Sequence, residues 1–234
     1  MRQGQVQRVD ACRLIVGDRR WEWAANNADG IVANWQTQLA KNPRFFNGRI
    51  QILTRYRIEG GVFSGNFTTT DFASFIHWRG LGYPDPSVHD CFGCAILRSN
   101  EGHILLGRQA AGNLNSGRAY CPGGFIDPAD VRPDRSIDID GSIQREIGEE
   151  TGLDLMSLRR EPGYVLVAAD ASIAIGVVYR SAMSANDLRA QIMAHITSES
   201  APELADILIV RTPADIADVK TSGYVVPLVQ ALLG

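Results

Sequence analysis

The sequence predicts an α+β fold built around a mixed β-sheet. Apolar runs with the β-branched and aromatic residues of strands recur along the chain, and segments with helical periodicity lie between them without regular alternation. The length of 234 residues and the hydrophobic content of 45% are enough for a sizeable core. We therefore expect one main domain with an added segment.

The first part of the chain is expected to form an α/β extension. Its expected elements are a strand in residues 6–16, a helix at 22–41, a hairpin that turns at Gly60-Gly61, and a short helix from Asp71 to Gly80. Two prolines without periodicity follow in the segment LGYPDPSVHD. We place a boundary there, which divides the chain into residues 1–85 and 86–234.

The second part contains most of the expected strands. They lie at residues 91–99, 103–109, 165–170, 171–182 and 206–212, and further helices are expected at 185–196 and 224–234. Between the second and third of these strands, a long loop rich in Pro, Gly and Asp leads into another helix, which carries an acidic motif.

The overall composition excludes several classes of protein. The net charge of −3 shows no footprint of nucleic-acid binding. No apolar run approaches the roughly 18 residues that a membrane span needs. The first residues, MRQGQVQRVDACRL, lack the apolar core of a signal peptide, so we expect a cytoplasmic protein.

Three of the four cysteines have a spacing that resembles a zinc site. Two residues separate Cys91 from Cys94, and Cys121 is a candidate third ligand. However, the run CFGCAIL is typical of a strand, in which Cys91 and Cys94 point to opposite faces. Buried structural thiols are therefore the preferred interpretation.

The acidic motif is REIGEETGL, residues 145–153. A helix brings its glutamates at i, i+3 and i+4 onto one face, where each like-charge pair costs roughly 0.2–0.5 kcal/mol. The apolar stripe of this helix consists of Ile139, Ile143 and Ile147. With Ile139 at zero and about 100° per residue, Glu150 falls near 20° and Glu146 near −20°, whereas Glu149 falls near −80°.

Two of these acids therefore overlap the edge of the buried face, where carboxylates are costly without a cation. Arg145 can pair with Glu149 four residues later, but one arginine cannot neutralise three carboxylates. A divalent hard cation such as Mg²⁺, which takes oxygen ligands, could do so together with substrate phosphate oxygens. Gly152 is a natural end for the helix.

This arrangement resembles the Nudix box, in which a glycine, five residues, a glutamate and seven residues precede R-E-U-x-E-E-x-G-U, with U apolar. Arg145 to Leu153 match the second half at every defined position, and Pro122-Gly123-Gly124 resembles the preceding loop. The resemblance implies a mixed sheet sandwiched by helices. It also implies a hydrolase that cuts a diphosphate linking a nucleoside to a group X.

The first half of the box departs from the pattern. Counting from Gly124 puts its glutamate at Asp130, with fourteen residues before Arg145 where the pattern has seven. Counting backward from Arg145 puts Ile137 there, which cannot bind metal. Asp130, Asp138 or Asp140 could substitute, although capping of the helix is the preferred role for Asp138.

The resemblance assigns roles to the motif residues. Three glutamates would hold one or more Mg²⁺ or Mn²⁺ ions: Glu146, Glu149 and Glu150. Arg145 would act with them as part of the catalytic set by orienting Glu149. Gly123 and Gly124 would let the backbone approach the diphosphate closely.

Other site residues are weaker candidates. The general base could be a box glutamate, or Glu199 or Glu203 in ITSESAPELAD, for which a solvated loop acid is the preferred interpretation. Arg108 and Arg118 flank the loop before the box and are candidate phosphate contacts, with plain surface residues as the alternative.

The identity of X depends on the flanks of the box. LLGRQAAGNLNSGRAY lacks the histidine of the coenzyme A branch of the family. The order of elements and the lengthened box loop look more like the UDP-glucose and UDP-galactose hydrolase branch. Under that resemblance, residues 1–85 would help to form the nucleotide pocket. Phe72, Phe75 and Trp78 could stack a base there, although core packing is preferred for them.

The first expectation is thus a UDP-sugar hydrolase that yields UMP and a sugar phosphate. The alternatives are an ADP-ribose or dinucleotide pyrophosphatase, a Nudix module that senses a nucleotide without cutting it, and an interaction protein with a solvated acidic helix. The expected partner is a nucleotide-type small molecule rather than nucleic acid or a membrane. A homodimer is left open.

Overall fold

The structure is a computed structural model that describes all residues from Met1 to Gly234. The strands of its larger sheet are β1 (Val6–Val9), β5 (Asp90–Arg98), β6 (Ile104–Gln109), β7 (Ala119–Tyr120), β8 (Leu158–Arg160), β9 (Tyr164–Ala169), β10 (Ser172–Ser181) and β11 (Leu204–Val210). The smaller sheet contains β2 (Ala11–Val16), β3 (Arg49–Glu59) and β4 (Val62–Asp71). The helices are α1 (Glu22–Asn26), α2 (Ala28–Lys41), α3 (Phe72–Gly80), α4 (Ile139–Thr151), α5 (Ala185–Ser198) and α6 (Val225–Leu233).

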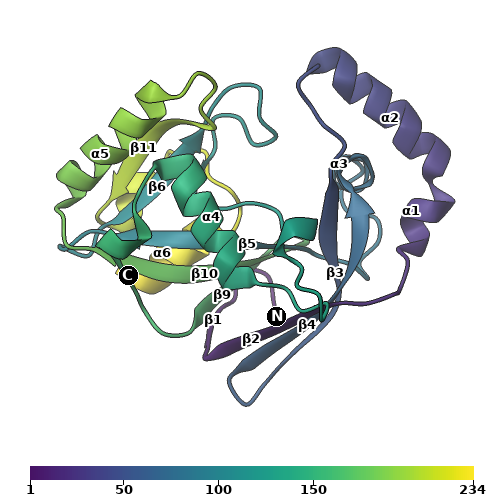
Figure 1. The fold of residues 1–234 in the computed structure, drawn as a ribbon, viewed down its shortest axis with the longest axis horizontal. Coiled ribbons are helices and arrows are strands. Elements are labelled where there is room, and N and C mark those ends of the chain that lie inside the picture. The colour runs from purple at the N-terminus through teal and green to yellow at the C-terminus, as the bar shows by residue number, and fades with distance from the viewer.

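The larger sheet is mixed, as the sequence predicts. Its strand order is β1-β9-β10-β5-β6-β11, with β10 parallel to β5 and the other neighbours antiparallel. Helices α4 and α5 cover one face and α6 covers the other (Figure 1). Gly93 lets α4 approach β5 closely, because a Cβ at this position would lie 2.6 Å from Cγ1 of Ile143. The predicted α+β fold, with a sheet between helices, is confirmed.

The N-terminal strand is divided between the two sheets. The prediction of a single strand over residues 6–16 is wrong, because β1 pairs with β9 of the larger sheet and β2 pairs with β4 of the smaller one. The chain changes sheets at Asp10, where the amides of Asp10 and Ala11 both donate to the carbonyl of Gly61. Residues 1–85 thus contribute one strand to the larger sheet, and the proposed division at residue 86 stays a prediction.

The other expected elements of this segment form largely as predicted. The helical region 22–41 is interrupted near Asn27, which separates α1 from α2. Gly60 and Gly61 have φ angles of 55° and 74° and turn the β3–β4 hairpin. Asp71 caps α3 by accepting a hydrogen bond of 2.7 Å from the amide of Ser74.

The lengthened loop before α4 is ordered against the smaller sheet. The amide of Val16 donates to the carbonyl of Arg135, and the amide of Ile137 donates to the carbonyl of Leu14, both at 2.9 Å. A bridge also joins Ile15 to Ser136. The insertion therefore ties the N-terminal segment to the start of the helix that carries the acidic motif.

The positions of the cysteines agree with a further expectation. Cys91, Cys94 and Cys121 are all buried, with exposures of 1%, 0% and 0%, as expected for structural thiols. No helix of the structure combines the length and apolarity required to span a membrane.

Candidate active site

Helix α4 has well-defined ends. Asp138 accepts a hydrogen bond of 3.0 Å from the amide of Gly141, which confirms its predicted capping role. Gly152 ends the helix in the left-handed conformation with a φ of 64°. Because these caps fix the register of the helix, the glutamates take the positions that their angles predict. Glu146 and Glu150 are 9% and 4% exposed, whereas the side chain of Glu149 is 61% exposed.

Glu150 connects the box helix to the glycine loop. Its carboxylate accepts hydrogen bonds from the hydroxyl of Tyr120 and, at 3.0 Å, from the amide of Gly123. Burial raises the pKa of Glu150 well above its usual value, and the nearby carboxylates of Glu203 and Glu146 raise it further. No arginine or lysine pairs with this buried acid.

Glu146 lies directly beneath Gly124. A Cβ on Gly124 would be 2.7 Å from Oε1 of Glu146, so a larger residue here would displace this carboxylate. Burial raises the pKa of Glu146 to about 7, although Arg145 acts in the opposite direction. Nη1 of Arg145 donates to Oε1 of Glu146 at 2.8 Å.

Arg145 also contacts one acid of its own helix and one acid of the loop. It donates to Oε2 of Glu149 at 3.2 Å and to the Asp130 carboxylate at 3.4 Å. Asp130 is buried and takes part in a capping box with Asp127. Of the three candidates for the first acid of the box, Asp130 is therefore the one that contacts a residue of the acidic motif. The residue that it contacts is Arg145, not one of the glutamates. Asp140 instead binds Arg160 and Tyr164.

Glu203 joins the site from the start of β11. It lines a cavity together with Gly123 and Gly124, and it accepts a hydrogen bond of 3.2 Å from Nε2 of Gln109. Desolvation raises the pKa of Glu203 although part of its side chain reaches solvent. Glu203 is exposed, as expected for a solvated loop acid, but it also contacts Gln109 and lines the cavity, so its role as general base stays a prediction. Glu199 is likewise exposed, at the end of α5, and lies outside the cavity.

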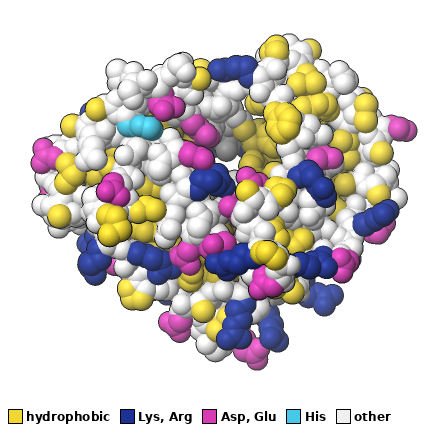
Figure 2. Space-filling model, viewed as in Figure 1, with side chains coloured by type: hydrophobic (Ala, Val, Ile, Leu, Met, Phe, Trp, Pro, Cys, Tyr) yellow, Lys and Arg dark blue, Asp and Glu magenta, His cyan; other side chains and the backbone are white.

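The cavity has a volume of about 440 Å³ and lies between the N-terminal segment and the larger sheet. Figure 2 shows a hollow in this region, with acidic side chains on its left and hydrophobic side chains on its right. The aromatic lining residues are Phe45, Phe72, Phe75, Tyr83, Phe92, Tyr120, Phe125 and Tyr224. The lining residues are polar or charged about as often as they are hydrophobic, and a concave site with both kinds of group can bind a small molecule.

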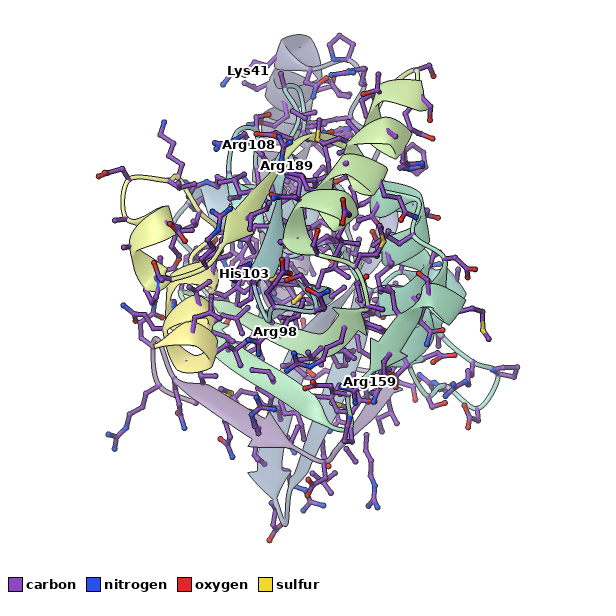
Figure 3. All side chains as sticks on the ribbon, turned by 90° about the vertical axis from the view of Figure 1, so that its left-hand side faces the viewer. Lys41, Arg98, His103, Arg108, Arg159 and Arg189 are labelled. Atoms are coloured by element: carbon purple, nitrogen blue, oxygen red, sulfur yellow. The ribbon has the colours of Figure 1, made fainter.

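Of the two arginines that the sequence suggests as phosphate contacts, only one lines the cavity. Arg118 lines the cavity and donates to the carbonyl of Thr221 at 2.8 Å. Arg108 does not line the cavity. It donates to the carbonyl of Gly117 at 3.3 Å and is labelled near Arg189 in the view of the α5 side (Figure 3). Trp78 and Phe75 are core residues with exposures of 0% and 1%, whereas Phe72 is half-buried.

The predicted metal ligands do not converge as a set of three. No group of three or more His, Cys, Asp or Glu side chains is arranged to hold a metal ion, and Glu149 lies on the exposed side with Arg145. The donor chemistry still fits a hard cation. The carboxylates of Glu203 and Glu146 both raise the pKa of Glu150, and Arg145 contacts only Glu146 among these three acids.

In comparisons with known proteins, this chain is similar to solved structures only. No family model matches the sequence, and no curated protein matches it. A MutT protein from Methanosarcina mazei Go1 is 20% identical with a TM-score of 0.40, over 62% of this chain and 92% of that one. A Nudix hydrolase from M. smegmatis, RenU, is 16% identical with a TM-score of 0.37, over 59% and 80%.

The third comparison is with a bifunctional NMN adenylyltransferase/ADP ribose pyrophosphatase from Francisella tularensis, in complex with AMP and a Mn ion. It is 16% identical with a TM-score of 0.43, over 68% of this chain and 45% of that one. All three TM-scores lie below 0.5, so the assignment to a family depends on the residues of the box itself.

Proposed function

We propose that the chain is a Nudix-type pyrophosphohydrolase, which cleaves the diphosphate linkage between a nucleoside and a group X. One observation carries the proposal. Two buried carboxylates, Glu146 and Glu150, contact the glycine loop, and Gly123 and Gly124 of this loop line a cavity of about 440 Å³. The two glutamates do not line the cavity themselves, and Arg145 is the only cation paired with either of them. Buried acids without counter-charge are costly unless a ligand or an ion supplies it.

Mg²⁺ or Mn²⁺ would supply that charge. Glu146 and Glu150 would hold the ion, and Glu149 would join them when its ion pair with Arg145 opens. When bound, such an ion neutralises charge on the diphosphate and lowers the pKa of a water molecule.

The other residues of the site have positioning and proton-transfer roles. Gly123 and Gly124 leave room for the diphosphate to approach the backbone, and Arg118 at the rim supplies positive charge for a phosphate. Glu203 would accept the proton of the attacking water, because its carboxylate faces the same space and has one lone pair engaged by Gln109.

A UDP-sugar is the first proposal for the substrate, with UMP and a sugar phosphate as products. ADP-ribose or a dinucleotide is the alternative. The N-terminal segment supports a nucleotide pocket, since Phe72, Arg79 and Tyr83 line the cavity opposite the box. A cytoplasmic location and a homodimer remain expectations that the structure leaves untested.

A module that senses a nucleotide without cutting it is the second candidate. The engagement of Asp130 by Arg145 and the lack of a preformed metal cluster favour it. A turnover panel followed by mass spectrometry separates the two, using UDP-glucose, ADP-ribose and NADH with Mg²⁺ or Mn²⁺. Nucleoside monophosphate formed by the wild type supports the hydrolase, and tight binding without product supports the sensor.

Phe72→Ala is expected to raise KM about tenfold and to leave kcat nearly unchanged. Phe72 is half-buried at the cavity wall, and loss of an aromatic stacking surface costs about 1–3 kcal/mol per base. Steady-state kinetics of the purified variant measure this effect. Phe46→Ala is the matched control, because Phe46 belongs to the same segment, is 82% exposed and lies outside the cavity. An unchanged KM for Phe72→Ala would show that Phe72 does not contact the substrate.

A further inference from the structure

Asp90 is a carboxylate of the cavity that the proposed hydrolysis does not use. It begins β5 beside Ser172 of β10, in the parallel register that pairs these two residues. The hydroxyl of Ser172 donates to Oδ2 of Asp90 over 3.3 Å, and Asp90 has no ion pair. A carboxylate offers about four acceptor positions, so most of those on Asp90 are free.

The charge of Arg79 lowers the pKa of Asp90, but the hydrogen bonds of the arginines that line the cavity go to other residues. Arg79 donates to Oδ1 of Asn115 at 2.7 Å, and Arg118 donates to the carbonyl of Thr221. Burial raises the pKa of Asp90 to about 6, so the carboxylate is still charged at pH 8. An ionised group with a single long hydrogen bond in a cavity is costly for the protein alone and is typical of a ligand contact.

The surroundings of Asp90 favour a flat ring as the ligand. Phe72 and Phe125 lie edge to face with centroids 5.9 Å apart, and Tyr83 and Phe92 also line the cavity. Such walls suit an aromatic ring with one polar edge.

An ionised carboxylate can only accept hydrogen bonds. Uracil and guanine carry a ring N–H on their pairing edge, at N3 and N1. Cytosine and adenine carry a lone pair on the corresponding ring nitrogen, which would face the negative charge, and on that edge only their exocyclic amino group could donate to the carboxylate. The mismatch at the ring nitrogen weakens binding of these two bases, because the lone pair is left without a donor.

We propose that Asp90 is a specificity residue, which selects substrates whose base carries a ring N–H, uracil or guanine, over those with cytosine or adenine. This inference rests on the proposed diphosphate hydrolysis and narrows its substrate class. It favours a UDP-linked or GDP-linked substrate and disfavours ADP-ribose.

Matched pairs of substrates test the proposal. UDP-glucose and CDP-glucose differ only in the base, as do GDP-glucose and ADP-glucose, and comparison of the two pairs distinguishes uracil from guanine. At pH 8 with Mg²⁺, we expect wild-type kcat/KM to favour the ring N–H member of at least one pair by about tenfold or more. Asp90→Asn should reduce or invert that ratio, because its amide can donate to a ring nitrogen.

Asp218→Asn is the matched control. Asp218 is an exposed carboxylate that lies outside the cavity. This variant should keep the wild-type ratio. We expect Asp90→Asn to melt no lower than the wild type, since it removes a desolvated charge. If it fails to fold, Asp90→Ser provides the second variant, with loss of the preference as the expected result.

The possible outcomes separate this inference from the proposed function. Equal turnover of both members of each pair, or an unchanged ratio in Asp90→Asn, would overturn the role of Asp90 and leave the hydrolase intact. A variant that instead changes the ratio of UDP-glucose to UDP-galactose would show that Asp90 contacts the sugar, which also overturns it. If no substrate turns over, the proposed function fails. Calorimetry with UMP, CMP, GMP and AMP then tests Asp90 directly, and equal affinities within both pairs would refute the inference.

Discussion

Glu150→Gln is expected to lower kcat on the order of 1,000-fold, because the charge that would hold the metal ion is lost. Metal assistance contributes several kcal/mol to the barrier, and each 1.36 kcal/mol corresponds to a factor of ten. Glu150 also accepts hydrogen bonds from Tyr120 and Gly123, so its loss loosens the loop that faces the diphosphate. Turnover of UDP-glucose with saturating Mg²⁺ measures the effect.

The fold should survive this substitution. Burial raises the pKa of Glu150, which means that the charged carboxylate destabilises the folded state at neutral pH, and glutamine removes that charge. Circular dichroism and a thermal melt check this point. Glu59→Gln, at an exposed position of the β3–β4 hairpin, is the matched control. Full activity of Glu150→Gln, or its unfolding, would contradict the metal-site assignment.

Glu149→Gln gives a second view of the same site. The Nudix resemblance predicts that it abolishes turnover as Glu150→Gln does, although Glu149 is exposed and paired with Arg145. A loss comparable to that of Glu150→Gln would show that the ion pair opens during the reaction. A much smaller loss would restrict the metal set to the two buried glutamates.

Glu203→Gln is expected to lower kcat about 100- to 10,000-fold, the usual contribution of a general base. Because desolvation raises the pKa of Glu203, its carboxylate becomes protonated as the pH falls toward that value, and the wild-type rate should fall with it. The variant should lack this acid limb. Glu199→Gln, four residues earlier and outside the cavity, should behave as the wild type. A pH–rate profile that is the same for Glu203→Gln and the wild type would exclude this residue as the base.

Some features of the site follow from short stretches of sequence. The angles of Glu146, Glu149 and Glu150 relative to the isoleucine stripe are set by helix geometry alone, so their order of exposure could be predicted. The same is true of Asp138 and Gly152, which act on the backbone within one turn.

Other features depend on contacts between distant segments. Glu203 meets the box because β11 pairs with β6, which places it beside Gln109. Nothing in the local pattern of ITSESAPELAD distinguishes it from Glu199. Asp90 likewise lies at the cavity because β5 runs parallel to β10, and parallel neighbours far apart in sequence are not predictable from local periodicity. The split of residues 6–16 has the same origin.

The pairing of β1 with β9 has a consequence for how the chain is made. Val6 lies opposite Val167, so about 160 residues separate the partners. At about 5–20 residues per second, a ribosome needs roughly 8–30 s to synthesise that interval. During this time β1 has no partner, and the smaller sheet and its hairpin can form first from local contacts. The larger sheet is completed at this edge only after most of the chain has left the ribosome. The first strand of the nascent protein therefore takes its place only when the residues of β9 have been synthesised.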